Sequence, residues 1–358
     1  MGMLKGIKKK ELYNIILPGY ERGMLMNGRV LTEEREEKLS KYAAKSYLSK
    51  GRRKLEERCD IRTVYQRDRD RIIHSKSFRR LKDKTQVFIA PEKAHYRTRL
   101  THTLEVAQIS RTIARALNLN EDLTEAIALG HDLGHTPFGH CGEEILNEIH
   151  ENGFKHNEQS LRIVDFLEKK DAFGLNLTYE VRDGILNHTG NKEPFTLEGQ
   201  IVKISDRIAY INHDIDDAIR GSILKESQLP KDCLEKIGNT HSLRINNMIL
   251  DIINNSDNKD RIQISKEMKI YMDKLREFMF KEVYLNPKAK KEEKKAQNII
   301  KELYYYFLEK PEKLPIEIVE KVQENRLVEA VKDYVAGMTD KYALKKYMDI
   351  FVPKVWRE

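Results

Sequence analysis

Three histidines and an aspartate lie close together in one short stretch of the sequence. Residues 130–140 contain, in order, His131, Asp132, His135 and His140. Imidazole nitrogens and carboxylate oxygens are common protein ligands of divalent metal ions. Pro137 and Gly139 interrupt any helix that continues through the stretch. Because His-Asp pairs often arise by chance, the stretch indicates a metal site only if other segments supply further ligands.

The helix predicted before this stretch leads directly into it. Leu123 and Ile127 point inward, and His131 and His135 continue the same stripe at intervals of four residues. Buried polar side chains without partners are costly, so histidines that replace apolar residues at the end of a buried stripe need partners.

A second predicted helix also carries a histidine on its apolar stripe. Val106, Ile109, Ile113 and Leu117 recur at helical spacing, and His102 lies four residues before Val106. His102 is therefore predicted to point inward. A single inward histidine is more often a hydrogen-bonded core residue than a metal ligand, and the sequence pattern alone leaves both interpretations open.

A third helix, predicted over residues 199–220, has a polar face opposite its isoleucines. Asp206, Tyr210 and Asp214 share this face at helical spacing. Such a face usually meets solvent. The flanking Val202 and Ala209 favour the alternative, a groove that the three polar side chains line.

These segments together could hold one divalent metal ion. His102, His131, Asp132 and Asp206 would supply two imidazoles and two carboxylates, a set that suits Mn, Mg, Fe, Co or Ni. The absence of cysteine from the set disfavours structural zinc. Four protein ligands leave open positions on an octahedral ion, as metal-assisted catalysis requires.

The composition sets broad limits on the class of protein. The 358 residues suffice for one large domain or two, and no apolar run approaches the roughly 20 residues of a membrane span. Three scattered cysteines and a basic N-terminus without an apolar segment predict a cytoplasmic protein without disulfides. The net charge of +8 suits either a polyanionic partner or only a lysine-rich surface.

The periodicity predicts an all-α protein in three parts. No alternating strand pattern and no glycine-rich phosphate loop is found. We expect an N-terminal helical extension over residues 1–60, a metal-binding core over 61–222 and a C-terminal helical region over 223–358. Within the extension, a helix is predicted to start at Thr32 and end near Gly51. The basic residues 52–54 that follow could contact phosphate or face solvent.

Several longer sequence blocks occur in an order that is typical of one enzyme family. They are residues 62–63, 66–74, 78–81, 84–88, 99–102, 130–140 and 336–340. The blocks resemble the dGTPase-like deoxynucleoside triphosphate triphosphohydrolases of the HD phosphohydrolase superfamily, over about residues 60–345. A mammalian dNTPase with an HD domain after a sterile alpha motif is a more distant relative. The resemblance implies an HD-domain helical core with peripheral N- and C-terminal helices.

The resemblance also implies roles for individual residues. The four proposed ligands match the family's metal ligands. His140 matches the catalytic histidine and Glu143 the carboxylate that pairs with it. His135, His156, Arg99 and Arg207 match phosphate contacts, and the residues that match contacts to the deoxyribose are Gln86, Val87, Tyr210 and Asp214. An aromatic ring under C2′ would exclude a 2′-hydroxyl. The mammalian relative has Asp where this chain has Glu143, and the resemblance assigns no role to His188.

The function that we expect from the resemblance is cleavage of a dNTP into a deoxynucleoside and inorganic triphosphate, which would control dNTP pools. dGTP is slightly favoured, but no residue fixes the base. A homo-oligomer is expected, with an activating nucleotide or single-stranded DNA as a further partner and no membrane contact. Two alternatives remain. One is another HD phosphohydrolase, such as a monophosphatase or a phosphodiesterase, and the other is a non-catalytic binder of nucleotides or single-stranded nucleic acid.

Overall fold

The computed structural model describes residues 27–86, 97–168, 173–284, 287–322 and 327–354. Over these ranges the regular structure is helical, and β-pairing is limited to two isolated bridges, Arg52–Thr178 and Thr85–Thr98. The prediction of an all-α protein is therefore confirmed. In the same ranges, no helix combines the length and the apolar character that crossing a membrane would require.

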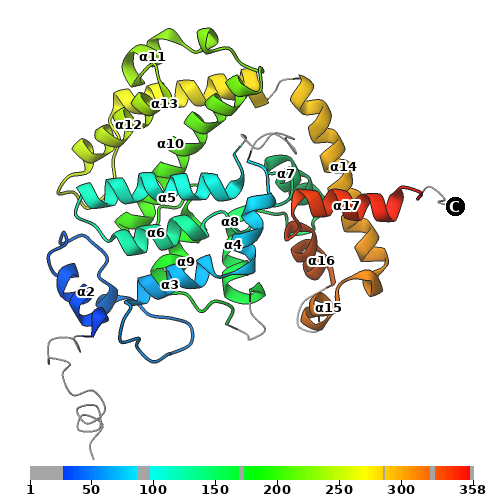
Figure 1. Ribbon diagram of the computed structural model, residues 1–358, viewed down its shortest axis with the longest axis horizontal. Helices are drawn as coiled ribbons and strands as arrows, with labels where there is room; N and C mark the ends of the chain where they lie inside the picture. Colours follow the sequence, from blue (N-terminus) through cyan, green and yellow to red (C-terminus); the bar gives the residue numbers. More distant parts are fainter. Residues whose placement is uncertain (1–26, 87–96, 169–172, 285–286, 323–326, 355–358) are drawn as a thin grey trace, which may run out of the picture.

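The first half of the chain builds the centre of the molecule (Figure 1). After the peripheral helix α2 (Gly28–Glu36), its helices are α3 (Val64–Ile73), α4 (Lys76–Arg80), α5 (Arg99–Ala116), α6 (Glu121–Gly130), α7 (His140–Ile149), α8 (His156–Arg162), α9 (Tyr179–Asn187) and α10 (Leu197–Arg220). The long helix α10 packs against α5, α6 and α9, and α6 also packs against α3. The helices that carry the predicted ligands are thus direct neighbours.

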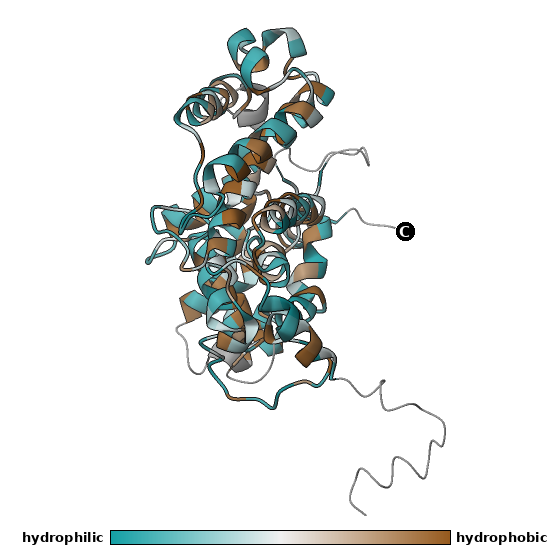
Figure 2. Cartoon of the chain, turned by 90° about the vertical axis from the view of Figure 1, so that its left-hand side faces the viewer, coloured by the Kyte–Doolittle hydropathy of each residue, from teal (hydrophilic) through white to brown (hydrophobic). Residues whose placement is uncertain are grey.

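The second half of the chain adds two further groups of helices, one at the top left of Figure 1 and the other at its right-hand side. One group is α11 (Lys231–Ile237), α12 (His241–Ser256) and α13 (Lys266–Met279). The other is α14 (Pro287–Glu309), α15 (Ile316–Val322), α16 (Leu327–Ala336) and α17 (Asp340–Phe351). Many of the helices are brown on one side and teal on the other in Figure 2, as expected for amphipathic helices that bury one face.

Buried apolar side chains form two clusters. The larger runs from Tyr65 to Val283 and includes the predicted stripes of α5, α6 and α10. The helices α11, α12 and α13, which follow the predicted boundary at residue 222, add their apolar side chains to this cluster. The smaller cluster joins α14, α16 and α17 to α7 and the turn before it, with Phe138, Leu146 and Phe307 among its members. The helix that begins at His140 is therefore anchored mainly by the C-terminal group.

The prediction for the N-terminal helix is wrong at both ends. The helix α2 begins at Gly28, because the Asn27 side chain accepts a hydrogen bond from the amide of Val30 and caps it there. The hydroxyl of Thr32 donates to the carbonyl of Gly28 within the helix. The helix ends at Glu36, whose buried carboxylate accepts from the amide and the hydroxyl of Ser46. Because of these bonds, the chain folds back after Glu36, and the helix does not continue to Gly51.

The basic residues after Gly51 hold the N-terminal part against the core. Arg52 forms a buried ion pair with Asp68 of α3 and donates to the carbonyl of Val64. Asp68 also accepts from the amide and the hydroxyl of Thr178. Arg53 lies over the ring of Phe166 and near Asp165. Arg52 therefore has a structural role, which is neither of the two roles considered for the basic residues 52–54.

We expect the change Asp68→Ala to lower the free energy of unfolding by about 3–5 kcal/mol, because it leaves Arg52 buried without a counter-charge. Asp70→Ala on the same helix removes a more exposed pair with Arg62 and should cost less than about 1 kcal/mol. Urea denaturation of both variants measures the difference. Equal losses for the two variants would contradict the structural role of the Arg52–Asp68 pair.

Candidate active site and metal cluster

Three helices bring the four predicted metal ligands together. His102 lies in the first turn of α5, His131 and Asp132 follow the end of α6, and Asp206 lies on α10. Nε2 of His102 lies 3.0 Å from Oδ1 of Asp206 and 3.9 Å from Oδ2 of Asp132. Nε2 of His131 lies 3.4 Å from Oδ1 of Asp132 and 3.7 Å from Oδ1 of Asp206. Ligands on an octahedral ion with bonds of about 2.1 Å lie roughly 3.0–4.2 Å apart, so this spacing fits one ion.

The orientation of His131 also fits a metal ligand. Its Nδ1 lies 2.6 Å from the carbonyl oxygen of Ala128, which fixes the hydrogen on Nδ1 and leaves Nε2 facing the carboxylates. Nε2 is buried and has no hydrogen-bond partner within the described ranges. Although burial alone would lower it, Asp132 and Asp206 raise the pKa of His131 to about 9. A positive charge at Nε2, as a proton or a metal ion, is therefore favoured, and the cluster can hold a divalent ion.

Asp132 is the most heavily contacted group of the cluster. Arg99 donates to its Oδ2 at 2.9 Å, and Nε2 of His135 lies 3.2 Å from its Oδ1. Burial alone would raise the pKa of Asp132, but His131, His135 and Arg99 hold it well below its ordinary value. Burial and the nearby Arg99 lower the pKa of His135 well below its ordinary value. The site thus contains an ionised carboxylate beside a neutral imidazole.

A close backbone contact places His156 beside His135. A Cβ atom added at Gly134 would overlap the carbonyl oxygen of His156 and the amide of Ser160, so α8 can approach only because residue 134 is glycine. The Ser160 hydroxyl accepts from the amide of Gly134 and donates to the carbonyl of His131. The rings of His135 and His156 consequently stack, with centroids 3.9 Å apart. His135 itself lies beyond the end of α6, not on the helical stripe that the spacing predicts.

The carboxylate of Glu143 lies closer to His156 than to His140. It accepts from the amide of His156 at 2.8 Å and lies 2.9 and 3.0 Å from that residue's Nδ1. Nδ1 of His140 lies 3.9 Å away, and the His140 side chain is 78% exposed. Burial alone would raise the pKa of Glu143, but His140 and His156 hold it well below its ordinary value. In this state of the protein, Glu143 mainly orients His156, and His140 stands at the mouth of the site.

The turn before His140 is fixed from the far end of the chain. Phe138 and Gly139 both have positive φ angles, of 64° and 61°. The carboxylate of Asp340 accepts from the amide of Phe138 at 3.0 Å and from the amide and hydroxyl of Thr85. Lys84 donates to the carbonyls of His135 and Ala336, and burial lowers the pKa of Lys84 to about 7. Residues 84–85, 135–138 and 336–340, from three of the sequence blocks, therefore meet in one hydrogen-bonded unit.

A cavity of about 640 Å³ opens above the cluster. The predicted site residues that line it are Gln86, Arg99, His102, Asp132, His135, His140, His156, Asp206, Arg207 and Tyr210. His131 and Asp214 are buried and do not line the cavity. Glu143 does not line it either, but its carboxylate lies next to His156 and His140, which do. Val87 lies outside the described residues.

Further residues that were not predicted to belong to the site also line this cavity, among them His188, Lys203, Arg276 and Phe280. His188 follows the end of α9, Lys203 lies on α10, Arg276 lies in the last turn of α13, and Phe280 directly follows that helix. Burial, with His131 and His156 nearby, lowers the pKa of His188 to about 3. The resemblance to the family had assigned His188 no role, although it lies in an Asn-His-Thr-Gly segment, residues 187–190, that is typical of the family. For Arg276 and Phe280, the local sequence pattern is an ordinary amphipathic helix.

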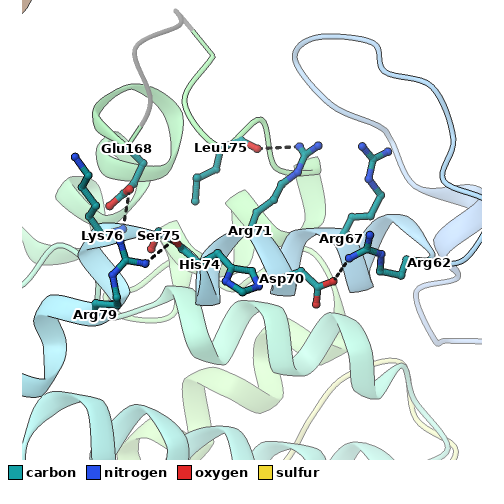
Figure 3. Close-up of a pocket in the computed structure, with 10 residues that line it drawn as sticks. All are labelled: Arg62, Arg67, Asp70, Arg71, His74, Ser75, Lys76, Arg79, Glu168 and Leu175. Carbon is teal, nitrogen blue, oxygen red and sulfur yellow. Dashed lines mark hydrogen bonds and ion pairs between the residues drawn. The ribbon is translucent and has the colours of Figure 1, made fainter.

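A separate cavity of about 470 Å³ lies along α3 and α4, away from the metal cluster (Figure 3). Its cationic lining residues are Arg62, Arg67, Arg71, Lys76 and Arg79, opposed by Asp70 and Glu168. Arg62 is paired with Asp70, and Arg71 donates to the carbonyl of Leu175. The expected binding of an activating nucleotide or single-stranded DNA stays a prediction, for which this basic cavity is one location.

Comparison with known proteins places these features in a family. Residues 99–211 match the HD domain, and residues 262–349 match the phosphohydrolase-associated domain. A deoxyguanosinetriphosphate triphosphohydrolase-like protein of Caldanaerobacter subterraneus subsp. tengcongensis is 61% identical over 93% of this chain and 98% of its own. A protein of the same name from Clostridium tetani is 51% identical over 87% of this chain and 92% of its own.

A solved structure agrees at the level of the fold. A phosphohydrolase from Bacteroides thetaiotaomicron aligns with a TM-score of 0.50 and 19% sequence identity, over 78% of this chain and 68% of that one. The His/Asp cluster that could hold a metal ion, the HD-domain match and the highly similar relatives agree with one another. We conclude that the chain is a hydrolase that belongs to the dGTPase-like family of HD-domain phosphohydrolases.

Proposed function

We propose that this protein is a metal-dependent dNTP triphosphohydrolase, which cleaves a deoxynucleoside triphosphate into a deoxynucleoside and inorganic triphosphate. One observation carries the proposal. The His/Asp cluster lies at a cavity that is also lined by the cations Arg99 and Arg207 and by the ring of Tyr210. Cations offset the charge of a triphosphate, and a ring offers a flat surface to a sugar.

These side chains would serve different parts of the reaction. An oxygen from water bonds to the α-phosphorus, the bond from this phosphorus to the 5′-oxygen breaks, and the 5′-oxygen takes up a proton. When bound, a divalent ion polarises a phosphoryl oxygen and lowers the pKa of water. His102, His131, Asp132 and Asp206 would hold it. Arg99, which donates to Asp132 and has buried nitrogens without partners in the described ranges, is oriented to contact a phosphate.

Two histidines could serve proton transfer. His140 stands at the mouth of the cavity, where a leaving 5′-oxygen and solvent would both be within its reach. The Glu143 carboxylate lies against Nδ1 of His156, so Nε2 of His156 faces the site. We assign the proton donor to His140 and a phosphate contact to His156, with Glu143 between them as the shared carboxylate. Glu143 would stabilise the protonated form of His140 when the two approach.

Discrimination at the sugar would come from α10 and the segment before α5. Tyr210 is half-buried at the wall of the cavity, and Gln86 is buried with an Oε1 atom that has no partner in the described part of the chain. A ring packed under C2′ leaves no room for a 2′-hydroxyl. For the ion, the mixed imidazole and carboxylate set suits Mn better than Mg, with Fe, Co and Ni as further candidates.

Product analysis is the most direct test of this function. With each of the four dNTPs, alone and in mixtures, and with Mn or Mg, we expect deoxynucleoside and tripolyphosphate as products. Mixtures are needed because one dNTP could activate cleavage of another. Orthophosphate or pyrophosphate as the released product would instead support a different HD phosphohydrolase. Binding of nucleotides or single-stranded DNA with no turnover in any mixture would support the non-catalytic alternative.

The change His140→Ala should lower kcat by about 10²–10⁴-fold, the usual contribution of a general acid. Because His140 does not belong to the ligand set, the metal content of the variant, measured by elemental analysis, should equal that of the native protein. His241→Ala, at the start of α12 and outside the lining of both cavities, is the control and should keep full activity. Turnover that survives His140→Ala would remove the role assigned to this residue.

We expect Asp340→Ala to reduce kcat by about 10²-fold, because the Phe138–Gly139 turn loses the hydrogen bond from its Phe138 amide and His140 shifts. Metal content should not change, since Asp340 contacts no ligand of the cluster. Asp349→Ala, at an exposed position of the same helix α17, is the matched control. Unchanged kcat in Asp340→Ala would show that the turn keeps its geometry without this carboxylate.

A further inference from the structure

Two acidic side chains of α16 contact the two helices that carry Glu143 and His156. The carboxylate of Glu329 lies 3.1 Å from Nε2 of His150, directly after the C-terminal end of α7. One helical turn later on α16, the carboxylate of Asp333 contacts α8. A helix of the C-terminal group therefore helps to fix how α7 and α8 lie relative to each other.

The contact between Asp333 and α8 involves two residues of that helix. Nε of Arg162 lies 2.9 Å from both carboxylate oxygens, and Nη2 donates to Oδ2 at 2.7 Å. The side-chain amide of Gln159 donates to Oδ1 at 2.9 Å. Asp333 and Gln159 are both buried. Bidentate bonds between a guanidinium and a carboxylate are strong, and they fix orientation as well as distance.

His156 begins this short helix, which runs from His156 to Arg162. Its ring lies at the cavity, against the carboxylate of Glu143 and the ring of His135. A rotation of α8 would move this ring away from both, because backbone hydrogen bonds make the helix turn as one unit. The contact with Asp333 near the other end of the helix resists such a rotation.

Two further hydrogen bonds connect α8 to the core. The hydroxyl of Ser160 donates to the carbonyl of His131, and the side chain of Asn157 donates to the carbonyl of Leu186. Both join neutral groups, and such bonds are weaker than those in which donor and acceptor are charged. Among the described residues, Asp333 therefore makes the strongest polar contact of α8 with another helix outside the cavity.

We propose that Asp333 is a positioning residue of the hydrolytic site, which holds α8 so that His156 contacts the phosphate chain of the substrate. Asp333 does not line the cavity, so it acts on the substrate only through His156. The assignment rests on the proposed function, because it takes His156 as a phosphate contact. It deepens that function by giving the C-terminal group a part in binding the triphosphate.

The change Asp333→Asn keeps the size of the side chain and removes its charge. We expect it to raise the KM for a dNTP and the Kd for inorganic tripolyphosphate about 10- to 100-fold, the contribution of one hydrogen bond to a charged group. The value of kcat should change little, because the proton donor His140 lies on α7. Calorimetry on the metal-loaded, full-length protein measures the Kd without turnover.

Binding of the deoxynucleoside, which has no phosphate, separates positioning from a general loss of structure. Its Kd should be the same for the native protein and Asp333→Asn. Equal losses for the deoxynucleoside and tripolyphosphate would overturn the assignment, and so would unchanged binding of tripolyphosphate.

A double variant tests whether Asp333 acts through His156. His156→Gln removes the phosphate contact, so the further change Asp333→Asn should weaken tripolyphosphate binding no more. Two losses that add would contradict the proposed route. Arg162→Lys keeps both charges but loses the bidentate geometry. It provides the same comparison in both backgrounds where Asp333→Asn does not fold.

Asp165→Asn is the matched control. Asp165 accepts from Nε and Nη2 of Arg182, as Asp333 does from Arg162. The two aspartate side chains are 6% and 5% exposed, and the two arginine side chains 23% and 22%. Because the Asp165 pair ends on α9 and not on α16, its loss should lower stability and leave tripolyphosphate binding unchanged. Weaker binding in this control as well would contradict the specific role of Asp333.

Product analysis of the native protein decides the proposed function separately. If dNTPs yield no tripolyphosphate while binding of added tripolyphosphate still depends on Asp333, only the proposed reaction fails. If dNTPs yield tripolyphosphate and its binding does not depend on Asp333, only the positioning role fails. A native protein that does not bind tripolyphosphate would remove the phosphate contact and the positioning role with it.

Discussion

The rest of the site depends on the contacts of one carboxylate, that of Asp132. It lies between Arg99, His131 and His135, and close to His102. Each of these groups is buried, and each would be costly to bury alone because charges and unpaired polar atoms lose their solvation. When they are buried together, their charges and hydrogen bonds offset these costs. The ends of α5 and α6 can therefore meet in an otherwise apolar interior, and α10 closes the cluster with Asp206.

The helical part of this arrangement could be predicted from the sequence. His102 lies on a stripe of buried apolar residues in α5, and the structure confirms that it points inward. The face of α10 that carries Asp206 and Tyr210 lines a cavity, whereas spacing alone left solvent exposure as the more common outcome. Helical spacing succeeds here because it predicts which side chains lie on the same face of a helix. The apolar residues then show which of the faces is buried.

Contacts outside the helices could not be predicted in the same way. His135 lies beyond the last turn of α6, and its stacking on His156 depends on the close approach of α8 that Gly134 permits. The preference of the Glu143 carboxylate for His156 over His140 follows from the left-handed turn at Phe138 and Gly139, which no periodic pattern encodes. Arg276 reaches the cavity from a helix whose sequence resembles any amphipathic surface helix. These contacts join segments that are far apart in the sequence, so no local sequence pattern indicates them.

The Asp340 contact has a consequence for the order in which the protein is made. The residues of the metal cluster leave the ribosome well before residue 340, which comes near the end of the chain. Until Asp340 emerges, the amides of Thr85 and Phe138 lack the carboxylate that accepts from them, and α7 lacks the apolar partners that α14, α16 and α17 supply. A nascent chain can therefore bring the His/Asp cluster together early, but it completes the turn that holds His140 only after residue 340 has been made.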